Sequence, residues 1–395
     1  MAVTNPQAAD AFRSDLRLAT NACRAAVGTQ RTNSHDNTWG LWLSFCTEHQ
    51  VDPLLATIPD PIPYLQVFAQ RYRDGRLAKN GFPVRSRSVE DALRAIGQTM
   101  ASMGATDRRL IAPKHLDYRL SQQLAGWRRI DPPPERVTPA SLRLLDYAHE
   151  LAVLHPTPLQ HAVVDMSYIA FFYLNRPGEY AQTTSSDPLS EPFRLCDVEF
   201  SIGVRIFNAS VAPLADIRMA VFANLIFTTQ KNAVRGEKIG HGRTGHSFSC
   251  PVLALIRHVL HLRLHSAPPT APLYLSFRST SAKPTFVTAA RITAMLRLSA
   301  TALYPTLGID PKRISARSLR AGGAMALLCA RVDTDIIRLV GRWRSDEMLR
   351  YLHLQAYPLM RTFAQRMLSS GHFSLLPNQD IAPEALSLLE LVPIP

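Results

Sequence analysis

The sequence predicts a mainly α-helical protein with a small antiparallel β-sheet (α+β), organised as two domains. Three observations lead to this prediction. Apolar residues recur at helical spacing along most of the chain, and between about residues 195 and 229 the period changes to 2. The proline run at 132–134 interrupts the helical pattern. The composition is that of a folded chain, because 46% of the residues are hydrophobic and 19% are charged.

The first part of the chain predicts a helical domain. Residues 1–30 are polar and rich in Ala, so we expect a flexible segment that is weakly helical at most. Residues 31–130 then contain four amphipathic patterns, which predict four helices in a compact domain. Their apolar stripes consist of Trp39, Trp42, Leu43 and Cys46; Leu65, Phe68 and Tyr72; Val89, Leu93, Ile96, Met100 and Met103; and Leu116, Leu120, Leu124 and Trp127.

A basic loop lies between the second and third of these helices. It contains two glycines, one proline and the single acid Asp74, which indicates a loop able to follow a phosphate backbone. A solvated charged face is the alternative interpretation. The candidate DNA-binding residues of the loop are Arg71, Arg73, Arg76, Lys79, Arg85 and Arg87.

Residues 131–137 predict a linker, because three consecutive prolines impose an extended segment. The second domain is expected at 138–368, with Thr138 capping its first helix and Pro139 at the first helical position. A turn at Gly203 joins two strands, and a third strand-like run ends near Thr229. Helices are expected at about 139–154, 158–174, 251–265 and 288–303. Residues 369–395 form a tail with a short apolar helix at 381–392.

The net charge favours a polyanionic partner. The chain has 44 Lys+Arg against 31 Asp+Glu, a formal charge of +13, and basic side chains bind polyanions by releasing condensed counterions. A basic protein without such a partner is the alternative. The five cysteines form no CxxC pair, and we find no glycine-rich phosphate loop and no HExxH motif. With no apolar run of about 18 residues and no signal-peptide pattern, we expect an intracellular protein.

Residues 314–353 carry the strongest indication of chemistry. Arg317 and Arg320 lie one helical turn apart, and Tyr351 follows Gly341 at a distance of ten residues. Arginines that bind one phosphate, followed by a single tyrosine, predict phosphoryl transfer with the tyrosine as nucleophile. An amphipathic surface tyrosine is the alternative.

Two further basic residues stand at special positions upstream. Arg176 follows an apolar helix and precedes a Pro-Gly turn, so it needs an anionic partner, either a phosphate or the nearby Glu179. Lys231 follows a strand-like run directly, which places it at a strand end or at a hairpin tip. An ordinary surface lysine is the alternative there.

These residues together resemble the tyrosine recombinase/integrase family, over about residues 30–360. LNRPGEY is similar to the family's first arginine box, TTQKN to its β-hairpin lysine, and RSLRAGGA to its His-x-x-Arg box. GRWRSDEMLRYLH is similar to the third box and the nucleophile segment. The sequences of RSLRAGGA and GRWRSDEMLRYLH are most similar to those of the mobile-element branch. The catalytic residues that the resemblance implies are Arg176, Lys231, Arg317, Arg320, Arg342 and Tyr351. Arg317 departs from the family's histidine, and Arg342 departs from its histidine or tryptophan.

The resemblance implies a SAM-like core-binding domain followed by a phage-integrase-like catalytic domain. It implies a site-specific recombinase of transposase type that cuts and rejoins double-stranded DNA through a 3′-phosphotyrosyl intermediate, without metal or other cofactor. It also implies a homo-oligomer (dimer or tetramer) on DNA, with the 381–392 helix docking on a neighbour, and no membrane. The expected location is the nucleus in a eukaryote, or the cytoplasm and nucleoid in a prokaryote. The two non-standard arginines leave a catalytically weakened or inactive DNA-binding protein as one alternative, and a type IB topoisomerase-like enzyme as another.

Overall fold

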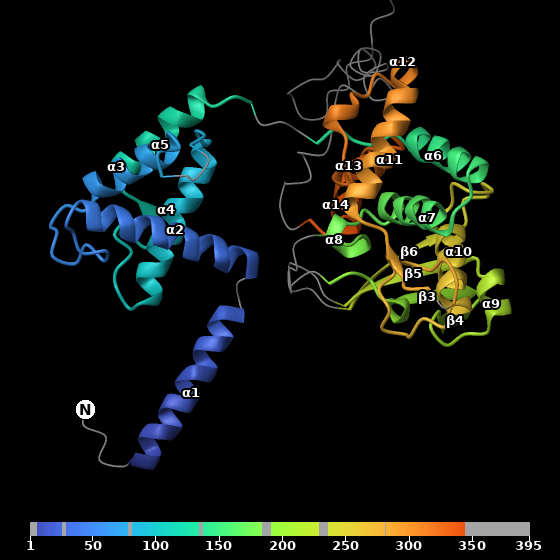
Figure 1. The fold of residues 1–395 in the computed structure, drawn as a ribbon, viewed down its shortest axis with the longest axis horizontal. Coiled ribbons are helices and arrows are strands. Elements are labelled where there is room, and N and C mark those ends of the chain that lie inside the picture. Colours follow the sequence, from blue (N-terminus) through green and yellow to red (C-terminus); the bar gives the residue numbers. More distant parts are fainter. Residues whose placement is uncertain are drawn as a thin grey trace, which may run out of the picture. The chain divides into compact units, whose positions relative to one another are not determined.

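The computed structural model describes residues 6–25, 29–77, 81–133, 137–183, 191–228, 236–280 and 282–343. The chain divides into two compact units, one before and one after residue 135 (Figure 1). The described residues are mostly helical with small antiparallel sheets, which confirms the predicted fold class.

The first unit begins with a helix that the sequence did not lead us to expect. Helix α1 spans Pro6–Ala25, so the prediction of weak helicity at most was wrong for this segment. Its alanines, arginines and leucines are strong helix formers, and this propensity outweighs the lack of a packed face. Phe12, Leu16 and Leu18 of α1 are all exposed.

Four further helices of the first unit enclose a core. They are α2 (Thr29–Glu48), α3 (Ile62–Arg73), α4 (Ser86–Ser102) and α5 (Tyr118–Ile130). Trp42 packs edge-on to Phe68 and stacks on Phe45, and most of the predicted apolar stripes are buried around these rings. Leu43 and Met103 were expected inside but are exposed. A short hairpin, β1 (Leu110–Ala112) with β2 (His115–Leu116), was not predicted.

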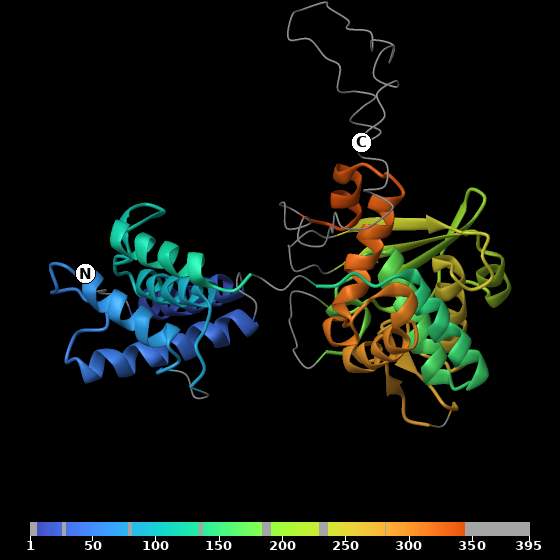
Figure 2. The same ribbon diagram turned by 90° about the horizontal axis from the view of Figure 1, so that it is seen from above.

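The second unit is built around one buried helix, α7 (Pro158–Phe172). Ten consecutive residues of α7 are buried, as its all-round apolar sequence requires. Helices on several sides of α7 cover it, and Figure 2 shows the same unit turned by 90°. The other helices of the unit are α6 (Leu142–Leu154), α8 (Pro177–Tyr180), α9 (Leu214–Met219), α10 (Pro251–Leu264), α11 (Ala289–Ala302), α12 (Tyr304–Leu307), α13 (Arg317–Cys329) and α14 (Thr334–Val340).

An antiparallel sheet of four strands packs against α10. Its spatial order is β4-β3-β5-β6, with β3 at Val198–Ile202, β4 at Arg205–Asn208, β5 at Phe222–Phe227 and β6 at Glu237–Gly242. Gly203 has φ +56° and makes the β3–β4 turn, which confirms the predicted strands and their turn. Strands β7 (Leu275–Ser276) and β8 (Thr285–Phe286) form a separate short pair.

The first helix of the second unit starts later than predicted. The N-cap of α6 is Ser141, whose hydroxyl accepts a hydrogen bond from the backbone N–H of Arg143, so the cap assigned to Thr138 was wrong. The segment before α6 is not helical but is bound to α13, because the N–H of Ala140 donates to the carbonyl of Ser318 at 2.9 Å. This contact holds the start of the unit against α13.

Two glycines let α13 approach its neighbours closely. A Cβ on Gly322 would lie 2.1 Å from the carbonyl oxygen of Ala140, and one on Gly323 would lie 2.0 Å from that of Phe171. We therefore expect Gly323→Ala to lower the free energy of unfolding by about 1–3 kcal/mol through overpacking. Urea titration followed by circular dichroism measures this change. Gly126→Ala, at a helical position with nothing within 4 Å of the added Cβ, is the control and should stabilise its helix by about 1 kcal/mol. Equal stability of the Gly323→Ala variant and the wild type would contradict the close approach.

None of the helices in the described part of the chain is both long enough and apolar enough to cross a bilayer.

Candidate active site

Arg176 lies at the point where α7 ends and the single turn α8 begins. Leu174 has φ +50°, so the chain leaves α7 through a left-handed residue before it reaches Arg176. The backbone N–H of Arg176 donates to Glu179 Oε2 at 2.7 Å, and its Nη1 donates to Oε1 at 3.0 Å. The Glu179 side chain is 1% exposed and that of Arg176 is 24% exposed. The buried carboxylate therefore orients an arginine whose guanidinium reaches the surface.

Arg342 is held inside the unit behind this pair. Its Nη2 donates to Glu179 Oε2 at 3.0 Å and to the Leu174 carbonyl at 3.3 Å, and its Nη1 donates to the Tyr173 carbonyl at 3.2 Å. Its Cζ lies 3.7 Å from the centroid of the Phe227 ring. Arg342 itself has φ +56°, a backbone conformation that a side chain with a Cβ adopts rarely.

Arg320 reaches the same segment from α13. It is 4% exposed, and its Nη2 donates to the carbonyl of Gly341. Its Cζ lies 4.4 Å from the centroid of the Trp343 ring, which is the geometry of a cation–π contact. Gly341 is required beneath that ring, because a Cβ there would lie 1.6 Å from a ring carbon.

The structure thus brings together three of the predicted arginines. Glu179 contacts Arg176 and Arg342, although Glu179 and Arg342 are 163 residues apart in sequence, and Arg320 contacts the residues on either side of Arg342. Arg317 lies exposed at the first position of α13, one turn before Arg320, and has no ion-pair partner within the described ranges.

Charge and burial oppose each other at Arg342. Burial lowers its pKa to about 10, the neighbouring Glu179 acts in the opposite direction, and Arg176 adds to the lowering. Arg342 is therefore still protonated at neutral pH. One acid between two arginines leaves a net positive site, which suits an anionic ligand.

Three predicted site residues, Lys79, Lys231 and Tyr351, lie outside the described residues. The strands that lead to Lys231 are described. Phe227 at the end of β5 pairs with Glu237 at the start of β6, and the N–H of Gly236 donates to the carbonyl of Phe227. Since Phe227 also contacts Arg342, the base of the hairpin that carries Lys231 adjoins the arginine cluster.

Two residues of the predicted DNA-binding loop are engaged within the first unit. Arg71 Nη1 lies 2.8 Å from Glu48 Oε1, and its Cζ is 5.4 Å from the ring centroid of Phe45. Arg73 pairs with Asp131 at 2.9 Å, and both of these side chains are mostly buried. Asp131 also accepts a hydrogen bond from the backbone N–H of Ser86, so this residue, assigned to the linker, is bound to the helical unit.

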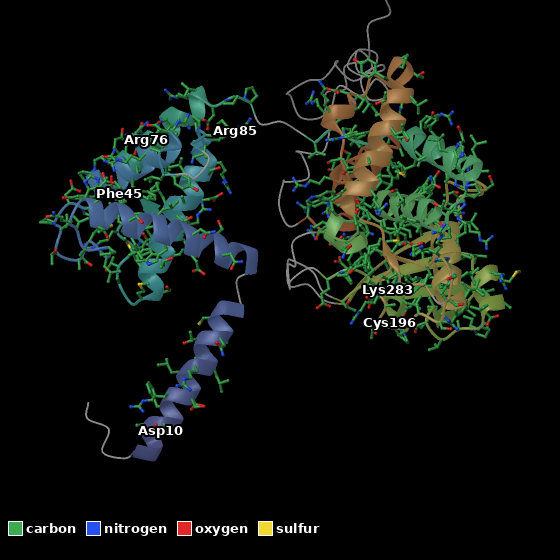
Figure 3. All side chains as sticks on the ribbon, viewed as in Figure 1. Asp10, Phe45, Arg76, Arg85, Cys196 and Lys283 are labelled. Atoms are coloured by element: carbon green, nitrogen blue, oxygen red, sulfur yellow. The ribbon has the colours of Figure 1, made fainter. Side chains whose placement is uncertain are left out.

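The other described arginines of this loop face solvent. The Arg76 side chain is 58% exposed and pairs with Asp74, and the Arg87 side chain is 71% exposed and lies 3.4 Å from Asp91. Arg85 is also exposed, just before α4, and Figure 3 labels it with Arg76. Surface pairs of this kind contribute little to stability, so these guanidinium groups are available to a ligand.

Comparison with solved structures finds recombinases. The chain is similar to a lambda integrase dimer bound to a core site (11% identity, 85% of this chain and 92% of that one, TM-score 0.45). It is also similar to the Tn1549 transposon integrase in complex with a circular intermediate DNA (11%, 78% and 86%, 0.41). A third match is XerA recombinase (14%, 84% and 98%, 0.35). The fold is similar to that of tyrosine recombinases. No protein-family model matches the chain, and no curated protein sequence does.

Sequence reasoning missed several groups around this arginine cluster. The carbonyls of Tyr173 and Leu174 and the ring of Phe227 all contact Arg342, and the sequence patterns predicted none of these contacts. The sequence contained only an indirect indication of these contacts. An apolar run that ends at an arginine box predicts that backbone carbonyls near the arginine are buried. Among the described residues, no cluster of three or more His, Cys, Asp or Glu is arranged to hold a metal ion.

Proposed function

We propose that this chain is a DNA strand transferase, a site-specific recombinase or integrase of transposase type that acts through a 3′-phosphotyrosyl intermediate. The observation that carries the proposal is the convergence of Arg320 and, through Glu179, of Arg176 on the segment 341–343, which precedes Tyr351 in the chain. The transition state of phosphoryl transfer is stabilised by positively charged hydrogen-bond donors at fixed positions, and this cluster supplies such donors.

The reaction follows from the roles of these residues. The Tyr351 hydroxyl gives up its proton to solvent water as its oxygen attacks the scissile phosphorus, a 3′-phosphotyrosyl bond forms, and the bond from phosphorus to the 5′ oxygen breaks. Arg176, Arg317 and Arg320 stabilise the charge on the non-bridging oxygens. Lys231 donates the proton that the leaving 5′ oxygen takes up. Attack of a 5′-hydroxyl on the phosphotyrosine reverses these steps and joins strands.

Arg342 has a different role in this proposal from that of a direct phosphate ligand. Its guanidinium donates to three backbone carbonyls, those of Tyr173, Leu174 and Val340, and to Glu179 inside the unit. We infer that it positions Glu179, and through it Arg176, while Arg317 takes the donor role at the surface.

The test of this function is covalent capture. The protein is incubated with a nicked duplex that carries the terminal repeat of its element, and denaturing gels detect a protein–DNA adduct. An adduct together with joining of strands between two duplexes supports the recombinase. Tight binding without an adduct favours the inactive DNA-binding alternative, and supercoil relaxation without joining favours the topoisomerase-like one.

The proposal extends to partners and organisation. Double-stranded DNA is the substrate, residues 31–130 and 138–368 form the core-binding and catalytic domains around the linker, and the chain assembles as a homo-oligomer on DNA. The predicted docking helix at 381–392 lies outside the described residues. Its removal is the corresponding test, since assembly on DNA should be lost and monomer folding kept.

The difference between the exposed and the internally paired arginines of the basic loop gives a prediction about DNA affinity. Arg87→Ala removes an exposed cation, so we expect weaker DNA binding, a slope of log K against log salt reduced by about 1, and unchanged stability. Arg73→Ala leaves Asp131 without its buried partner and should lower the free energy of unfolding by roughly 3 kcal/mol. Fluorescence anisotropy across a salt series and urea titration measure the two effects. Loss of DNA affinity with unchanged stability in Arg73→Ala would contradict this division.

A further inference from the structure

Asn175 is a buried polar residue with no hydrogen bond to its side chain. It is 0% exposed, and neither its Nδ2 nor its Oδ1 has a partner among the described residues. Asn175 directly precedes Arg176. The carbonyl of Leu174, the residue before Asn175, accepts a hydrogen bond from Arg342. Buried amides are nearly always hydrogen-bonded, so an amide with both ends unpaired beside a candidate catalytic arginine needs an explanation.

Local backbone structure does not explain this asparagine. The left-handed position at the end of α7, where asparagine is favoured, is occupied by Leu174 with φ +50°. The cap of α8 is Arg176, whose backbone N–H is bonded by Glu179, and the Asn175 side chain takes no part in it. The N–H of Asn175 donates to the Ala170 carbonyl at 3.0 Å, a bond that any residue except proline can make.

Packing favours a different residue at this position. Leucine has the same branched arrangement of side-chain heavy atoms as asparagine, buries no polar atom, and continues the apolar run of α7. The free protein would therefore fold more stably with an apolar side chain. Polar groups that lower stability in this way are found mainly where function requires them.

We propose that Asn175 is a positioning residue for strand cleavage, whose amide acquires its hydrogen bonds when the site assembles on DNA and then fixes the backbone that carries Arg176. The proposal rests on the strand-transfer function proposed above. Its chemical basis is that an amide side chain both donates and accepts hydrogen bonds. The Asn175 amide can therefore bridge two groups of the site once the site has assembled on DNA. Because the residue is enclosed, it acts through Arg176 and does not touch the DNA.

The test compares Asn175→Leu with the wild type in three measurements. We expect a higher urea midpoint, unchanged DNA affinity, and a single-turnover rate of covalent adduct formation reduced about a hundredfold, as expected when a catalytic group is misplaced by about 1 Å. Asn175→Ala, which is too small to clash, is the second variant and should show the same loss of rate. A purely structural residue would change the midpoint and leave the rate per folded molecule unchanged.

A second unpartnered polar residue provides the matched control. Ser276 on β7 is also 0% exposed, its hydroxyl has no partner among the described residues, and it pairs with Thr285 of β8. Ser276→Ala should raise the midpoint and leave the rate of adduct formation unchanged. If Asn175→Leu and Asn175→Ala keep the wild-type rate, or if Asn175→Leu lowers the midpoint, the proposal is overturned. Failure of the wild type to form any adduct would refute the proposed function, a result distinguishable from these.

Discussion

Tyr351→Phe is expected to bind DNA with the affinity of the wild type and to form no covalent adduct. The substitution keeps the aromatic ring and removes only the oxygen that attacks the phosphorus, so the arginine cluster remains able to hold the phosphate. Electrophoretic mobility shift measures binding, and denaturing gels measure the adduct on the nicked duplex. The expected effect is complete loss of cleavage, because no other atom of residue 351 can replace the phenolic oxygen.

The control for this prediction is the nearest other tyrosine. Tyr357 follows Tyr351 by six residues, and Tyr357→Phe should form the adduct at the wild-type rate. An adduct that survives Tyr351→Phe but disappears in Tyr357→Phe would move the nucleophile to the second position. Peptide mapping of the adduct would then identify the attacking residue directly.

Local patterns were sufficient to predict the elements that frame the site. The apolar run that ends at Arg176 predicted α7 and its abrupt end, and the change of period predicted β3, β4 and β5. The α7 signal lies within 15 residues and each strand signal within a single strand, and burial is the physical cause of both patterns. The β1–β2 hairpin was missed because each strand has only two or three residues, too few to show a period.

The partners of individual arginines could not be predicted in this way. Arg71 and Arg73 look the same in sequence as Arg76 and Arg87, but Glu48 and Asp131 lie within reach of the first two. Arg342 was assigned a catalytic role from its motif position, and that role stays a prediction. Its observed partners include two backbone carbonyls, and every residue has a carbonyl, so no sequence pattern distinguishes those at positions 173 and 174.

Arg342→Met is expected to destabilise the second unit strongly. The variant keeps an unbranched side chain and the same steric cost at φ +56°, but it removes the charge beside Glu179 and the donors to the carbonyls of Tyr173 and Leu174. Removing one partner of a buried ion pair costs about 3–5 kcal/mol, because the other charge remains buried. Urea titration of the variant and the wild type measures this loss.

A second substitution separates a positioning role from a direct role in catalysis. After Arg342→Met, the buried Glu179 carboxylate keeps only Arg176 as a charged partner among the described residues. Glu179→Gln in this background removes that buried charge, so we expect part of the lost stability to return. The double variant should not cleave DNA even where stability is regained, since Arg176 then lacks the carboxylate that orients it. If cleavage recovers together with stability, Arg342 acts through folding alone and the Glu179 carboxylate is not needed to orient Arg176.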